Sequence, residues 1–292
     1  MPVPRVRRCK HLPLIAACAV LAGITAQAPA TATPSPGPTA GTQSAAAAAD
    51  SRYGSYDYSS YYGSYDDTYY KDAVGKTGPA LKDALHSIIK EQTQLSYDDV
   101  WDALQTTDED PDNPANVILL YTGRSQSKSA HGSGPDDWNR EHVWAKSHGD
   151  FGTATGPGTD IHHLRPTDVS VNSTRGSKDF DNGGGEVEEA PGNRTDDDSF
   201  EPRDAVKGDV ARMILYMAVR YSGDDSFADL EPNDQVNNGS KPFIGRLSVL
   251  KEWSTQDPPD TFEQKRNQVI YDRFQHNRNP FIDHPEWVEE IW

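Results

Sequence analysis

Five of the nine histidines fall within 33 residues, and this part of the sequence holds the side chains most suited to catalysis. They are His131, His142, His148, His162 and His163. Histidine titrates near neutral pH, so it can accept a proton or bind a metal ion. A single histidine is more often structural than catalytic, but this clustering favours a site that handles protons or a metal.

Two short segments of alternating character surround His142 and His163, and a Gly- and Thr-rich stretch, residues 149–159, joins them. This pattern predicts the two strands of a hairpin-like unit. Pro166 is expected to end the second strand because its nitrogen carries no hydrogen to donate.

A short helix is expected after the strand pair, because Thr167 or Asp168 can cap it. Asn172 and Arg175 lie three residues apart on that helix and therefore share roughly one face. The strand pair and the helix would together bring a carboxylate, an imidazole and an amide oxygen into one small region.

Helices are expected on both sides of this unit, because apolar residues recur there at helical spacing. The segments concerned are 81–89, 100–104, 210–221 and 259–275. An apolar run at 117–120 predicts a buried strand. We therefore expect an α+β fold, mainly helical, built around a short antiparallel strand pair.

The beginning of the chain has the pattern of a secretory signal. Four basic residues precede an apolar segment at 12–25, and Ala26-Gln27-Ala28 has the form of a signal-peptidase site. Residues 1–28 are therefore predicted to be a cleaved signal, and the protein to be secreted. The alternative is a lipoprotein processing box ending at Cys18, which would leave the protein tethered by a lipid.

Residues 29–68 are predicted to be a disordered linker, rich first in Ala, Pro and Ser and then in Tyr, Ser, Gly and Asp. Eight of the 13 tyrosines lie between Tyr53 and Tyr70. They indicate either a surface-attachment segment or a soluble linker, and the lack of apolar periodicity favours the linker. Residues 69–292 are expected to form the folded domain.

The formal net charge is −17, from 28 Lys and Arg against 45 Asp and Glu. Such a balance argues against a polyanionic partner. The charge is uneven, however: residues 139–178 hold five basic and four acidic side chains, whereas 181–209 hold three and ten. We expect the second segment to be a solvated acidic loop. No apolar run reaches the roughly 20 residues of a membrane span.

Three segments, in their order and spacing, resemble the bacterial endonuclease I family, whose secreted or periplasmic members are His-Me finger (ββα-metal) nucleases. They are N-R-E-H-V-W at 139–144, D-I-H-H-L-R-P-T-D at 160–168 and V-N-S-T-R-G at 171–176. Segments near 95–101, 207–217 and 277–286 resemble the family as well. The resemblance thus extends over about residues 69–292.

This resemblance implies that His142 is the general base and that Glu141 and Asn172 are metal ligands. The expected ion is Mg²⁺, with Mn²⁺ and Ca²⁺ as alternatives, because a hard cation that keeps several waters needs few protein ligands. Adjacent strand residues point to opposite faces. How both Glu141 and His142 reach one site is left open by the sequence.

Arg165 and Arg175 are the nearest candidates for binding phosphate oxygens. For each of them a structural salt bridge to a local aspartate is an equally strong interpretation. His162 and His163 are expected to support the site, or else to be structural. Some periplasmic family members supply an arginine from a long insertion that this chain lacks, and Lys146 is the only basic residue between His142 and Asp160.

The expected function is that of a secreted, monomeric, largely non-specific endonuclease that cleaves DNA, with RNA as a further substrate, and leaves 5′-phosphate and 3′-hydroxyl ends. Two alternatives stay open. One is a zinc-dependent peptidase or phosphatase whose histidines bind the metal, although the sequence has no H-E-x-x-H motif. The other is a non-catalytic surface-binding protein.

Overall fold

The structure is a computed structural model that describes Tyr65 and residues 68–292. The predicted signal at 1–28, the lipidation alternative at Cys18 and most of the predicted linker lie outside these residues. No helix in the described part of the chain combines the length and apolar character needed to cross a membrane.

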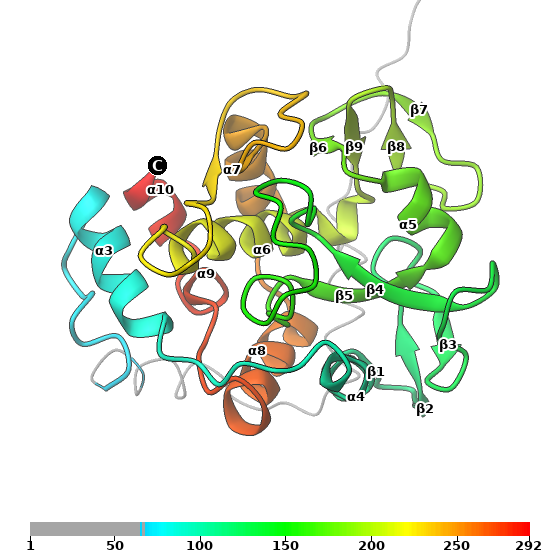
Figure 1. Cartoon of the computed structure of the whole chain (residues 1–292), viewed down its shortest axis with the longest axis horizontal. Coiled ribbons are helices and arrows are strands. Elements are labelled where there is room, and N and C mark those ends of the chain that lie inside the picture. The colour runs from blue at the N-terminus through cyan, green and yellow to red at the C-terminus, as the bar shows by residue number, and fades with distance from the viewer. Residues whose placement is uncertain (1–64, 66–67) are drawn as a thin grey trace, which may run out of the picture. The chain divides into compact units, whose positions relative to one another are not determined.

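The described residues form a mixed α+β fold, which confirms the expected class (Figure 1). The helices are α3 (Gly78–Ile89), α4 (Asp99–Thr107), α5 (Val169–Arg175), α6 (Lys207–Arg220), α7 (Leu247–Gln256), α8 (Thr261–Arg273), α9 (Pro280–Asp283) and α10 (Trp287–Ile291). A 3₁₀ turn, Asp204–Val206, leads into α6.

The strands are short and form separate small sheets. The first sheet contains β1 (Glu109–Asp110), β2 (Asn113–Ile118) and β3 (Ser125–Ser127), and the second pairs β4 (Trp138–His142) with β5 (Leu164–Asp168). The third contains, in spatial order, β6 (Asp179–Phe180), β9 (Ser199–Glu201), β8 (Arg194–Thr195) and β7 (Gly185–Glu186). The fourth is a parallel pair of β10 (Glu231–Pro232) and β11 (Phe243–Ile244). The stretch 181–209, expected to be a loop, thus carries short strands.

Helix α6 lies among the other helices, with α7, α3 and α9 packed against it (Figure 1). The sequence predicts one apolar stripe, but residues 208–220 are all buried, because neighbours cover the helix on every side. Gly208 allows its close start against α7: a Cβ there would lie 1.9 Å from the carbonyl oxygen of Asp257. A larger residue would force the two helices apart.

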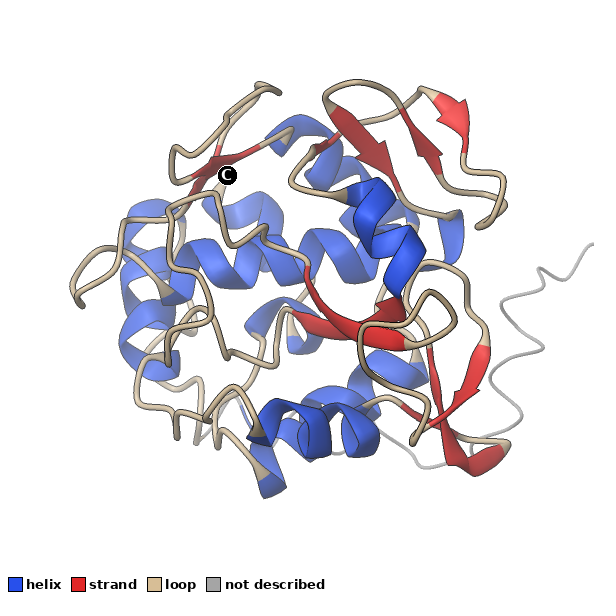
Figure 2. Cartoon of the chain, turned by 45° about the vertical axis from the view of Figure 1, so that its right-hand side comes forward, coloured by secondary structure: helices blue, strands red, loops and turns tan. Residues whose placement is uncertain are grey.

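Strands β4 and β5 pair antiparallel, with Trp138 opposite Asp168 and His142 opposite Leu164. Helix α5 follows β5 directly and packs against both strands (Figure 2). The predicted strand pair and helix are therefore present, but Pro166 does not end the second strand: it lies in the middle of β5, opposite Arg140, and the pairing continues to Asp168. The predicted buried strand at 117–120 is only partly present, because β2 ends at Ile118 and the buried residues Leu119 and Leu120 follow it.

The last tyrosines of the Tyr-rich segment contact the folded domain. The rings of Tyr65 and Tyr69 lie 6.0 and 5.6 Å from that of Tyr271 on α8, edge to face. Tyr70 is fully buried and donates a 2.7 Å hydrogen bond to Asp283. The domain therefore includes Tyr65, a few residues before its expected start at residue 69.

Candidate active site

A cavity of about 460 Å³ lies beside β4 and α5, and four of the seven predicted site residues line it. These are Glu141, His142, Asn172 and Arg175. A larger, more open cavity of about 700 Å³, formed by residues of α7 and the C-terminal segment, contains none of the predicted residues. The chemistry expected from the sequence therefore belongs to the cavity at β4.

Neighbouring residues of β4 share this cavity. The four consecutive residues 139–142 all line it, although successive side chains of a strand point to opposite faces. A cavity on one face could not collect all four. The cavity is therefore lined by residues from both faces of β4, which is how Glu141 and His142 share one site.

His142 is held as a neutral base. Its Nε2 lies 3.1 Å from the carbonyl oxygen of Gly158, and because a carbonyl can only accept, Nε2 carries the hydrogen and Nδ1 keeps a lone pair. Burial lowers the pKa of His142 well below its ordinary value, and the nearby His163 lowers it further. The imidazole is therefore ready to accept a proton at neutral pH.

The loop that supplies this carbonyl is compact and is held by His163. A Cβ at Gly158 would lie 2.6 Å from the carbonyl oxygen of Ala154, so the turn requires glycine. His163 Nε2 lies 2.7 Å from the carbonyl oxygen of Pro157, and its Nδ1 accepts from the Trp144 backbone N–H. His163 thus fixes the peptide next to the one that orients His142.

His162 lies deeper in the fold. Its Nε2 contacts Asn277, and its ring lies 4.5 Å from that of Tyr216. Burial lowers the pKa of both His162 and His163 to about 4, so both are neutral at pH 7. His162 fits the structural interpretation, and His163 the supporting one.

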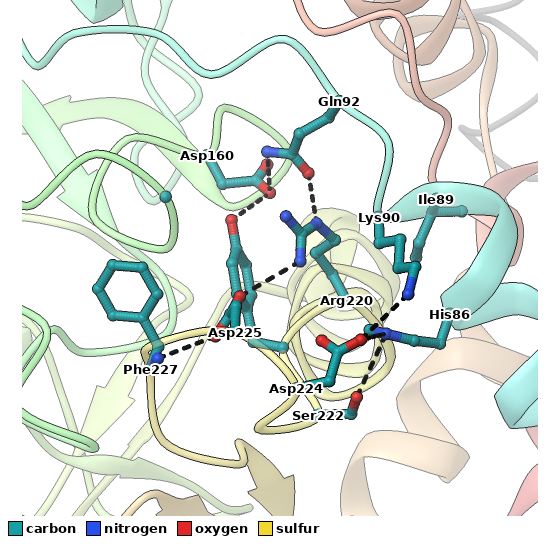
Figure 3. Close-up of polar contacts among 12 residues, drawn as sticks. His86, Ile89, Lys90, Gln92, Asp160, Arg220, Ser222, Asp224, Asp225 and Phe227 are labelled. Carbon is teal, nitrogen blue, oxygen red and sulfur yellow. Dashed lines mark hydrogen bonds and ion pairs between the residues drawn. The ribbon is translucent and has the colours of Figure 1, made fainter.

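Asp160 anchors the segment that carries these two histidines. Its carboxylate accepts a 3.1 Å hydrogen bond from Gln92 (Figure 3) and one each from the hydroxyls of Tyr216 and Tyr221 at 2.9 Å. Burial would raise the pKa of Asp160, but the neighbouring histidines and the hydrogen bonds outweigh it and lower the pKa. Side chains from distant parts of the chain thereby fix the start of β5.

Glu141 and Asn172 each retain an oxygen for the cavity. Glu141 is buried, and its Oε1 accepts from Tyr121 Oη at 2.8 Å and lies 3.4 Å from Arg175 Nη1. Both contacts use Oε1, which leaves Oε2 available. Asn172 donates through Nδ2 to Asn139 Oδ1 at 2.7 Å, so its own Oδ1 is oriented as an acceptor.

One carboxylate oxygen and one amide oxygen beside a cavity with room for water suit a hard, well-hydrated cation such as Mg²⁺. Zinc usually takes three or four His, Cys or carboxylate ligands. Within the described residues no group of three or more His, Cys, Asp or Glu side chains is placed to hold a metal ion. Four of the five clustered histidines instead hydrogen-bond separate backbone groups, as His148 does with Phe243 and Ser177, and the ring of His131 packs against Trp101 and Trp138.

Arg165 lies outside the cavity, which decides between its two interpretations. It is 2% exposed, does not line the cavity, and pairs with Asp108 at 2.5 Å and Asp209 at 3.1 Å. A guanidinium held by two buried carboxylates is not available to a phosphate. A buried salt bridge therefore replaces the phosphate-binding interpretation of Arg165, but with partners 57 and 44 residues away rather than the local aspartate that was expected.

Arg175 lines the cavity but is used within the fold. It is 1% exposed and donates to the carbonyl oxygens of His142 and Val143 at 3.1 and 2.7 Å. It therefore holds the end of β4 in place and sets a positive charge beside Glu141. Its position supports a role in positioning other residues of the site rather than in binding the substrate.

Several residues that line the cavity or hold its side chains were missed from the sequence. Tyr121, which holds Glu141, is 20 residues away from it and gives no local signal. Asn139 and Arg140 belong to the N-R-E-H-V-W segment and could have been considered with it. Tyr97 and Trp101 reach the cavity from the segment before α4 and from α4 itself.

Comparison with known proteins identifies the family of this chain. The model of the Endonuclease I family matches residues 77–286, and the chain belongs to that family. Two relatives, from Bacillus subtilis (strain 168) and Bacillus amyloliquefaciens, are each 67% identical over 226 residues, which cover 77% of this chain and 78% of the relative. Both relatives are named extracellular ribonuclease.

Proposed function

We propose that this protein is a secreted, divalent-metal-dependent nuclease that hydrolyses phosphodiester bonds in RNA and DNA, with β4, β5 and α5 as a His-Me finger. The observation that carries the proposal is the oriented, neutral His142 in one cavity with Glu141 and Asn172. The name of the relatives puts RNA beside DNA as a primary substrate, whereas the sequence alone put DNA first.

His142 acts as the general base in this proposal. Nε2 donates to Gly158, so Nδ1 is the atom that takes the proton from the attacking water. Burial keeps the imidazole neutral before the reaction. The protonated imidazole that forms is stabilised by the same Gly158 carbonyl, and the products carry 5′-phosphate and 3′-hydroxyl ends.

Glu141 Oε2 and Asn172 Oδ1 are the protein ligands proposed for the cation. Bound there, Mg²⁺ supplies positive charge to the phosphate and to the leaving oxygen. Arg175 and Tyr121 keep Glu141 ionised and in place, opposing the rise in pKa that burial causes. Asn139 holds the amide of Asn172 in the orientation that presents its oxygen.

The charge around the cavity supports a nucleic-acid substrate in spite of the net charge of −17. The lining includes three basic side chains, Arg140, Lys146 and Arg175, against the single acidic side chain of Glu141. Attraction to phosphate depends on the local field more than on the total charge. The acidic residues lie mainly elsewhere on the chain.

A cleavage assay tests the proposal. Purified protein is incubated with single-stranded RNA and, separately, with supercoiled plasmid, in Mg²⁺ and in chelator. We expect cleavage of both in Mg²⁺, its loss in chelator and its return when Mg²⁺ or Mn²⁺ is restored. Intact substrates under all conditions would favour the surface-binding alternative, and activity that survives chelation through a tightly held zinc would favour the zinc hydrolase.

A further inference from the structure

The guanidinium of Arg140, which lines the cavity, packs against two aromatic rings. Its guanidinium carbon lies 3.4 Å from the centre of the Tyr97 ring and 4.0 Å from that of Trp101. Nη1 also donates to the backbone carbonyl of Tyr97. Aromatic faces stabilise a guanidinium without neutralising it, since their attraction comes from the ring quadrupole.

This setting distinguishes Arg140 from the two arginines that the sequence suggested. Arg165 and Arg175 are almost fully buried and contact carboxylates at 2.5 and 3.4 Å. Arg140 is only partly buried, and its direct contacts in the described region are two rings and one carbonyl; the charge of Asp98 acts on it, but the two form no ion pair. Its charge, with Nε and Nη2, is therefore available to an anion.

The position of Arg140 is suited to a substrate phosphate. Arg140 and His142 lie two residues apart on β4, so their side chains leave the same face of the strand. Both contact the ring of Tyr97, the His142 ring at 5.9 Å between centres. The guanidinium of Arg140 therefore lies next to the proposed base, His142, in the same cavity.

We propose that Arg140 binds a phosphate of the substrate strand beside His142, and that the rings of Tyr97 and Trp101 position its guanidinium. The proposal rests on the nuclease function proposed above and names its phosphate-binding residue. A guanidinium offers parallel N–H groups that match two phosphate oxygens. Lys146 also lines the cavity and is exposed, but its side chain is long and flexible, so it is the weaker candidate.

Binding measured without cleavage tests this role. In full-length protein carrying His142→Ala, in Mg²⁺, the Kd for a fluorescein-labelled single-stranded RNA is followed by anisotropy at several salt concentrations. Adding Arg140→Gln is expected to raise Kd by about tenfold, as for the loss of one charge-assisted hydrogen bond. It should also reduce the slope of log K against log salt by about 0.7, the value for one phosphate contact.

The matched control is Arg194→Gln, which removes the same charge from an exposed position on β8 outside the cavity. It should leave Kd and the salt slope near those of the parent. Equal effects of the two substitutions would mean that Arg140 acts only through net charge and would overturn the proposal. If the parent binds RNA and Arg140→Gln binds it equally well, this proposal fails while the nuclease function stands.

The positioning role is tested by two substitutions of Tyr97 in the same parent. Tyr97→Phe keeps the ring and should leave Kd unchanged, whereas Tyr97→Leu removes it and should weaken binding several-fold. With Arg140→Gln already present, Tyr97→Leu should add nothing, because its effect acts through the guanidinium. A full, additive loss in that background would contradict the positioning role.

Discussion

Nη1 of Arg175 lies 3.4 Å from Oε1 of Glu141, and both side chains are almost completely buried. Burial raises the pKa of Glu141, and the guanidinium opposes that rise. The carboxylate therefore owes part of its charge, and hence its capacity to bind a cation, to Arg175. This pair links the end of α5 to the end of β4.

Arg175→Gln is expected to weaken cation binding, because it removes the charge that keeps Glu141 ionised. The Mg²⁺ concentration for half-maximal cleavage should rise by about tenfold, the lower end for a residue that supports a metal ligand. Titration of activity with Mg²⁺ at pH 7 measures it, with circular dichroism to verify folding. Tyr121→Phe, which removes only a neutral hydrogen bond, should give a smaller shift. An unchanged Mg²⁺ requirement in Arg175→Gln would refute the linkage.

Asn172→Ala should also raise the Mg²⁺ requirement, because it removes the amide oxygen that Asn139 orients. We expect a shift of at least about tenfold, and partial retention of binding in Asn172→Asp, which keeps an oxygen ligand. Ser173→Ala, one residue along the same helix and exposed, is the control and should behave as wild type. If both alanine substitutions leave the Mg²⁺ titration unchanged, Asn172 is not a ligand.

Arg165→Gln distinguishes a structural arginine from a phosphate-binding one. The substitution leaves the carboxylates of Asp108 and Asp209 buried beside an uncharged amide, although Arg266 still contacts Asp108. Breaking a buried pair in this way costs about 3–5 kcal/mol of unfolding free energy. Urea unfolding should show that loss, while KM of the folded fraction stays within about twofold of wild type. A stable variant with a raised KM would restore the original interpretation.

His162 and His163 should make the fold sensitive to mild acid. Their pKa values are about 4 in the fold and near 6.5 when unfolded, so between these values the unfolded chain binds protons that the folded chain does not. Stability is therefore lost as pH falls from 6.5 towards 4, by about 1.4 kcal/mol per pH unit for each histidine.

Urea midpoints measured at several pH values across that window test this expectation. Glu263, whose pKa burial raises to about 8, changes stability in the opposite direction, so the comparison uses a variant rather than the total slope. In His162→Gln, the loss of unfolding free energy per pH unit should be smaller by the contribution of one histidine. Parallel curves for wild type and variant would show that His162 does not titrate in this way.

Local patterns were enough to place the strand pair and α5. Alternation around His142 and His163 acts within a few residues of the strands it specifies, but the predicted cap is absent: Asp168 precedes α5 without a side-chain cap bond, and its carboxylate binds Thr122 and Arg124 instead. Of the seven site residues that the family motifs indicated, four line one cavity. Short-range signals therefore carried the centre of the site.

Contacts between residues far apart in the sequence determine the features of the site that local patterns could not predict. Arg165 and Arg175 look alike in sequence, but the partners of Arg165 are 57 and 44 residues away, so only the fold shows that its charge is used. The same holds for Arg140, whose hydrogen-bond partner Tyr97 is 43 residues distant. The strands within 181–209 are two or three residues long, too short to give a periodic signal.

The most direct measurement compares the Mg²⁺-dependent cleavage rate of RNA and plasmid by wild type, His142→Ala and His276→Gln, an exposed histidine outside the cavity. His142→Ala should lose at least about 10²-fold in rate while staying folded, since it lacks the general base. His276→Gln should cut at the wild-type rate. Cleavage by His142→Ala at the rate of wild type would contradict the proposed mechanism.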